Sequence, residues 1–138
     1  MKTAIIRQQG SVLVEGLIAI LIFSLGILSI VALLGASVKF TSNAKYRTEA
    51  NLLAGQIIGQ MWVDDKSNAA LLNNYSSPDG DVFSAWKESV AETLPGTEAE
   101  GNEPTIEIDG NNVVTVTIRW QLPGQVPNNH VAIARVRG

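Results

Sequence analysis

The chain has 138 residues, room for one small domain at most, and its thirteen acidic residues outnumber its ten lysines and arginines. That balance argues against a nucleic-acid partner, which would select for a basic patch. Because the chain contains no cysteine, disulfide bonds cannot contribute to its stability.

The first long element is an uncharged, strongly apolar run of 23 residues from Gly16 to Val38. As a helix it would span about 34 Å, enough for a hydrocarbon core of about 30 Å. A secretory signal peptide has a shorter apolar centre and a small-residue cleavage site after it, whereas Lys39 follows here. A buried core helix would need more surrounding protein than the rest of the chain supplies. The run therefore predicts one membrane-spanning helix.

The charges on either side of this run leave its orientation open. Basic residues precede it at Lys2 and Arg7 and follow it at Lys39, Lys45 and Arg47, so the positive-inside rule does not decide. The first segment is short, and the long acidic C-terminal part is the natural translocated portion. We therefore expect the N-terminus in the cytoplasm and the C-terminal head outside.

The junction before the span reads RQQGSVLVEGLIAIL, with Gly10, Ser11 and then a single acid, Glu15. A carboxylate within hydrocarbon costs a few kcal/mol, although near the helix end it could stay at the interface and gain from the helix dipole. An isolated intramembrane acid is nonetheless a functional candidate whose partner has to be named.

This junction resembles the class III signal of type IV prepilins and pseudopilins: a short basic leader, a glycine, and a glutamate at the fifth mature position before an apolar helix. The resemblance implies that prepilin peptidase cuts between Gly10 and Ser11 and N-methylates Ser11. It also implies that Glu15 neutralises the terminal ammonium of a neighbouring subunit in a filament core. The family usually has phenylalanine where this chain has Ser11, a departure that favours a minor subunit.

A second amphipathic half follows the span. Its apolar residues recur at helical spacing, with polar residues on the other faces: Tyr46, Ala50, Leu53, Ala54, Ile57 and Met61. No proline interrupts the sequence from Ser11 to Val63, so we expect one helix from Ser11 to about Trp62, roughly 78 Å long. Gly55 and Gly59 have GxxxG spacing, and we expect them to allow close contact with the head rather than dimerisation.

Two stretches of this helix, LIFSLGILSIVALL and the segment from Arg47 to Met61, resemble the helix of PilV-type minor pilins, also called type IV pilus modification proteins. The resemblance covers about the first 62 residues. It implies as partners prepilin peptidase, other pilins, the inner-membrane assembly machinery and membrane lipid. It places the chain in the bacterial inner membrane and then in a pilus.

The head begins with helical and loop segments. Residues 64–68 break the apolar stripe, and residues 69–72 suggest one or two further helical turns. After turn residues 76–81, Phe83, Trp86, Val90 and Leu94 recur at helical spacing, with Asp81 placed to cap this helix and Pro95–Gly96 to stop it. An acidic loop, unstructured in its sequence pattern, follows over residues 95–104.

The final third alternates as β-strands do. Residues 105–109 form one candidate strand, a turn follows at Gly110–Asn111, and the next strand lines one face with Val114, Val116, Ile118 and Trp120. Connections at residues 123–124 and 127–129 precede a last strand over residues 131–136. Three antiparallel strands resting on the second half of the long helix predict an α+β fold whose sheet buries one face.

No catalytic constellation is present. The lone histidine, His130, is most simply a solvated or packed residue, and a turn and a helix cap explain Asp79 and Asp81 better than a calcium site does. We expect no cofactor and no enzyme activity, and we expect Trp62, Trp86 and Trp120 in the core.

Four segments follow: a leader at 1–10, a membrane or filament-core half at 11–38, an amphipathic half at 39–63 and a head at 64–138. Three functions fit them: a minor pilin, a pseudopilin of a type II secretion system, and a membrane-anchored binding module that never polymerises. The glycine-to-glutamate junction disfavours the third function.

Overall fold

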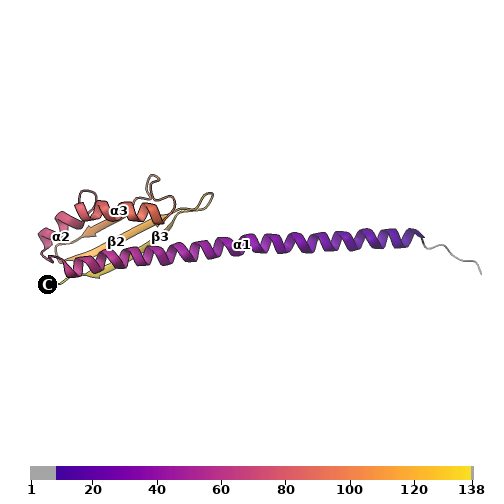
Figure 1. The fold of residues 1–138 in the computed structure, drawn as a ribbon, viewed down its shortest axis with the longest axis horizontal. Helices are drawn as coiled ribbons and strands as arrows, with labels where there is room; N and C mark the ends of the chain where they lie inside the picture. Colours follow the sequence, from indigo (N-terminus) through magenta and orange to yellow (C-terminus); the bar gives the residue numbers. More distant parts are fainter. Residues whose placement is uncertain (1–8, 138) are drawn as a thin grey trace, which may run out of the picture. The chain divides into compact units, whose positions relative to one another are not determined.

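A computed structural model of the chain describes residues 9–137. Three helices precede three strands (Figure 1), with bounds α1 Gln9–Val63, α2 Asn68–Tyr75, α3 Asp81–Thr93, β1 Thr105–Ile108, β2 Val113–Trp120 and β3 Asn128–Arg135. The chain divides into two compact units after Ser42, and α1 contributes residues to both. The predicted α+β fold is confirmed.

Helix α1 has the bounds that the sequence predicts, to within two residues. It is continuous over 55 residues, and its last turn closes where the Asp64 N–H donates to the Gln60 carbonyl at 3.1 Å. Continuity follows from the absence of proline, because every N–H beyond the first turn can donate within the helix.

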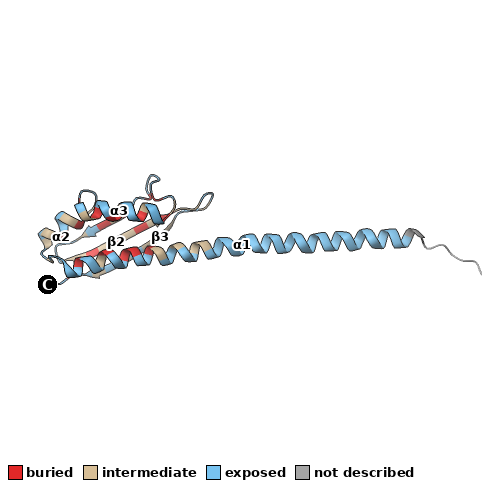
Figure 2. Ribbon diagram, viewed as in Figure 1, coloured by how far each residue is buried: buried red, intermediate tan, exposed pale blue. Residues whose placement is uncertain are grey.

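The C-terminal part of α1 supplies one wall of the head's hydrophobic core. The predicted stripe is confirmed: Ala50, Leu53, Ala54, Ile57 and Met61 are buried, and Tyr46 is partly buried against them. Figure 2 shows burial on α1 only along this part of the helix. Because these positions repeat every three or four residues, they fall on one face of the helix.

Two residue expectations for this part of α1 are wrong. Trp62 is 45% exposed, because it lies about 100° around the helix from the buried Met61 and the helix ends one residue later. Gly55 and Gly59 are exposed as well, and a Cβ placed on either would meet nothing within 4 Å. The GxxxG pair therefore makes no close contact with the head.

Helices α2 and α3 complete the helical side of the core. Ser67 caps α2, its Oγ accepting from the Ala70 N–H at 3.3 Å, and the helix is longer than the one or two turns expected over 69–72. Helix α3 buries Phe83, Trp86 and Val90 as predicted. Asp81 is not its cap: Gly80 occupies the N-cap position, and Asp81 is the first helical residue, where its charge still favours the helix dipole.

The three strands form one antiparallel sheet in the order β1-β2-β3. Ile106 pairs with Val116 and Val116 pairs with Ala132, so these residues share one face. On β2 that face is buried at alternate positions, listed as Val114, Val116, Ile118 and Trp120. The opposite face is only half-buried on β2 and exposed on β3, which confirms the expected one-sided sheet.

Strand β3 starts earlier than expected, since Asn128 and Asn129 pair with Trp120 and Arg119 instead of forming a connection. The acidic loop over residues 95–104 contains no helix or strand, yet it is tethered. Asn102 is buried, and its Nδ2 donates to the Gly96 carbonyl at 2.9 Å and to Gln121 Oε1 at 3.2 Å. Nothing in the local composition predicts this anchor.

Candidate processing and assembly site

The residues singled out at the junction lie in the first turns of α1. Gly10 is the second residue of the helix, Ser11 the third, and Glu15 follows Ser11 by one turn. The preceding leader, with Lys2 and Arg7, falls outside the described residues except for its last two positions. Ser11, Val14, Glu15 and Ile18 share one face of the helix, so Ser11 and Glu15 are neighbours on its surface.

The helix around this site is apolar and uncovered. Every residue from Ser11 to Thr41 is exposed, and the large apolar side chains are each about half exposed or more, for example Leu33 at 72%. One described helix is long and apolar enough to cross a membrane, and it contains this stretch. Nothing in its own unit covers the apolar surface, so lipid or other chains have to do so.

The polar groups inside this stretch are satisfied within the helix. The hydroxyls of Ser24 and Ser29 donate to the carbonyls of Ile20 and Leu25, at 2.7 Å and 2.8 Å. Such back-bonding removes the cost of placing a hydroxyl in an apolar medium. Glu15 is different: it is the only charged residue between Ser11 and Val38, and within residues 9–137 no cation lies in ion-pair range of its carboxylate.

Glu15 can therefore act as a docking point for a cation supplied by another molecule. A carboxylate surrounded by apolar surface is stable only when a positive charge or several hydrogen-bond donors meet it. The structure places Glu15 and Ser11 at the same helix face but contains no peptidase, neighbouring subunit or lipid. Cleavage, methylation and pairing at Gly10, Ser11 and Glu15 therefore stay predictions.

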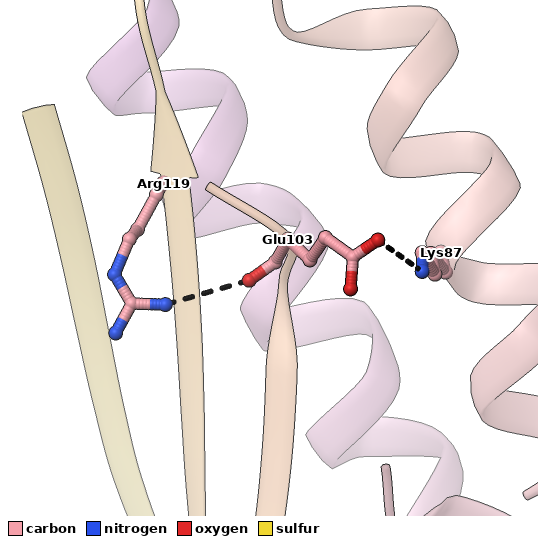
Figure 3. Close-up of polar contacts among 3 residues, drawn as sticks. All are labelled: Lys87, Glu103 and Arg119. Carbon is pink, nitrogen blue, oxygen red and sulfur yellow. Dashed lines mark hydrogen bonds and ion pairs between the residues drawn. The ribbon is translucent and has the colours of Figure 1, made fainter. Parts of the chain in front are cut away.

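The head carries a polar bridge between the acidic loop and its neighbours (Figure 3). Lys87 Nζ in α3 lies 3.3 Å from Glu103 Oε1, and Arg119 Nη1 in β2 donates to the Glu103 carbonyl at 3.4 Å. Both side chains of the ion pair are well exposed, so the pair contributes at most about 1 kcal/mol. Its effect is to set the position of the loop.

The turn between β1 and β2 is the most densely hydrogen-bonded part of the head. Asp109 Oδ1 accepts from the backbone N–H groups of Val113 and Asn111, both at 2.8 Å, and these bonds lower the pKa of the Asp109 carboxyl. Asn112 adopts a left-handed conformation with φ of 57°. Its Oδ1 accepts from Asn68 Nδ2 at 2.7 Å, and its Nδ2 donates to the Lys66 carbonyl at 2.9 Å.

A second polar contact fastens the end of α1 to α2. The hydroxyl of buried Tyr75 donates to Asp64 Oδ2 at 2.7 Å, and burial together with this carboxylate raises the pKa of Tyr75. The Asp65 carboxyl accepts from the Ser67 N–H at 2.9 Å, which lowers the pKa of Asp65. These groups organise the loop at residues 64–67 and hold no geometry for chemistry.

The remaining candidates from the sequence do not converge. His130 points to the half-buried side of β3, and its Nε2 is buried without a partner in residues 9–137, as is Trp120 Nε1. Asp79 and Asp81 are exposed. Within the described part of the chain, no three His, Asp or Glu side chains gather closely enough to hold a metal ion.

Comparisons with known proteins return nothing: no family model, curated protein or solved structure matches the chain. The architecture itself is pilin-like, with a long apolar N-terminal helix whose C-terminal part lies against a small antiparallel sheet.

Proposed function

We propose that this chain is a minor pilin-like structural subunit, cleaved after Gly10 and N-methylated at Ser11 by prepilin peptidase, which joins or primes a type IV pilus. One observation carries the proposal. The apolar surface of α1 is uncovered from Ser11 onward, and its only charge is a carboxylate one turn after the proposed new N-terminus.

The geometry of α1 gives this carboxylate a partner. Cleavage after Gly10 creates an ammonium at Ser11, four residues or about 6 Å along the axis from Glu15. A parallel neighbour displaced by about that distance would bring its terminal ammonium level with Glu15. Each charge then neutralises the other inside an apolar filament core, where either alone would cost several kcal/mol.

The same surface explains two successive locations. Before assembly, lipid of the bacterial inner membrane would surround α1, with the N-terminus in the cytoplasm and the head in the periplasm. In a filament, the apolar helices of neighbouring subunits would replace the lipid. The head then acts as a folded module that contacts other subunits, and its role is structural rather than catalytic.

The charge pairing is tested by replacing Glu15. Glu15→Val should leave cleavage intact but reduce incorporation into filaments at least about tenfold, since an unpaired buried ammonium costs more than the 1.4 kcal/mol that equals a factor of ten. Glu15→Asp keeps the charge and is the matched control. The measurement is the amount of mature chain in sheared filaments relative to the membrane fraction. Normal incorporation of Glu15→Val would overturn the pairing.

Deleting the gene distinguishes the pilus from other destinations. A pilus subunit predicts loss or shortening of surface pili with normal export of secreted enzymes. A fall in secreted enzymes with normal pili would assign the chain to a type II secretion filament. Normal levels of both, with the protein confined to membranes, would indicate an anchored module that does not polymerise.

A further inference from the structure

The two edges of the sheet expose different backbone groups. In an antiparallel sheet, alternate residues direct their N–H and C=O toward one neighbour and then the other. The Asp109 N–H donates to the Val113 carbonyl, and the Val136 N–H donates to the Asn112 carbonyl. Extended along the register, these bonds make four residues of β3 point away from β2: Asn129, Val131, Ile133 and Arg135.

The β1 edge is closed at its centre. The Ile106 carbonyl accepts from the Ser77 N–H at 3.0 Å and from Ser77 Oγ at 3.1 Å, and the Ile106 N–H donates to Ser77 Oγ at 3.3 Å. The outward groups of β3 make no hydrogen bond with any described residue. Strand β3 also lacks proline, and Val131 and Ile133 are 46% and 69% exposed. A long open edge of this kind favours association with another chain.

The two edges also differ in charge. Residues 113–138 contain three arginines and no acidic residue. Arg119 is directed toward Glu103, which leaves Arg135 and Arg137 exposed at the β3 side. Arg135 acts on the nearby Asp109 without an ion pair, so Arg137 is the less compensated cation.

The β1 side of the head is acidic. Its exposed carboxylates lie in the loop before β1 and on β1 itself: Glu98, Glu100, Glu103 and Glu107. Lys87 neutralises part of this charge through Glu103, and the other three acids have no ion-pair partner in residues 9–137. Because β1 and β3 are the outer strands, the acidic and basic surfaces lie on opposite edges of one sheet.

We propose that the β3 edge of one copy docks on the acidic β1 side of a second copy, head to tail. Arg135 and Arg137 would meet the carboxylates, and the outward N–H groups of Val131 and Ile133 would donate to them. Two different edges can meet with both heads in one orientation, whereas two β3 edges would bring their arginines close. Such a contact can repeat along a filament.

This contact involves the head alone and does not depend on cleavage after Gly10. Side-chain pairing at an exposed edge is weak between free molecules. Confinement of both copies to one membrane raises their effective concentration and favours the contact.

Engineered cysteines test the geometry cleanly, because the chain has none of its own. Full-length Ile133→Cys and Glu107→Cys carry different tags and are oxidised in membranes of cells that express one or both. Head-to-tail docking predicts a disulfide-linked dimer of the two different variants, at least fivefold above either variant alone. Val63→Cys, exposed at the end of α1, replaces Ile133→Cys as the control and should not link to Glu107→Cys.

Two results would overturn the proposal. Linkage of Ile133→Cys to itself would show that two β3 edges meet, and absence of the mixed dimer would show that copies do not dock at these edges. Charge exchange adds a second check: Arg137→Glu should lower the mixed dimer at least threefold, and Glu100→Lys in the partner should restore it. Failure of that rescue would contradict the charge pairing.

The outcome is separable from the proposed function. A mature N-terminus at Ser11 without the mixed dimer would leave the pilin proposal standing and remove the docking. The mixed dimer with an uncut N-terminus would do the reverse.

Discussion

The indole Nε1 of Trp86 in α3 donates a hydrogen bond to the backbone carbonyl of Leu53 in α1, at 3.0 Å. Trp86 is only 7% exposed and tilts against Phe83, with ring centroids 6.1 Å apart. The bond therefore joins two helices inside the apolar core. The C-terminal part of α1 is consequently a component of the head, and a head that lacked it would lose one wall of its core.

Replacing Trp86 tests this bond. Trp86→Phe should lower the free energy of unfolding by about 1–3 kcal/mol, because it removes a buried hydrogen bond and leaves a void where the larger ring lay. Trp62→Phe is the matched control; its ring is about half exposed, so we expect a change within about 0.5 kcal/mol. Urea unfolding of the full chain in detergent, followed by the circular dichroism of the head, measures both. Equal effects would contradict the placement of Trp86.

Asn112 ties the β1–β2 turn to the loop after α1. Asn112→Ala loses two side-chain hydrogen bonds and forces alanine into a left-handed conformation, so we expect a loss of about 2–4 kcal/mol. Asn112→Gly loses the same bonds without the backbone strain, so it should cost less, about 1–2 kcal/mol. Thermal unfolding ranks the two. A glycine variant less stable than the alanine variant would contradict the left-handed geometry.

Acid stability should depend on Asp109 and Asp65. Their folded-state pKa values lie below the model value of 3.8, so both carboxylates stabilise the fold above that pH, and the contribution is lost as the pH falls through the lowered values. Asp109→Asn should flatten the decline of stability below about pH 4, and adding Asp65→Asn should flatten it further. Unfolding midpoints measured between pH 2 and 6 test this. An unchanged slope in the double variant would contradict it.

Local pattern predicted most of the fold. Helical spacing from Tyr46 to Met61 and strand alternation from Val114 to Trp120 each report burial directly, so the helix, its buried stripe and the sheet could be derived. Features that depend on where chain segments meet could not. Trp62 is apolar but lies beyond the reach of the head, and the amide partners of Asn102 are distant in sequence.

The candidate site shows the same division. The spacing of Gly10, Ser11 and Glu15 is local, so the sequence places them on one helix end, and the structure adds that the surrounding apolar surface is uncovered. The difference between the two sheet edges has no local signal. It arises from Ser77 bonding to Ile106, 29 residues away, and from the strand order.

The N-terminal residue of the protein isolated from membranes and filaments tests the central claim most directly. Intact-mass and N-terminal peptide analysis should find Ser11 first, carrying one additional methyl group, while Gly10→Leu should accumulate as the full-length chain. A wild-type protein that begins at Met1, or at any residue other than Ser11, would contradict the proposed function.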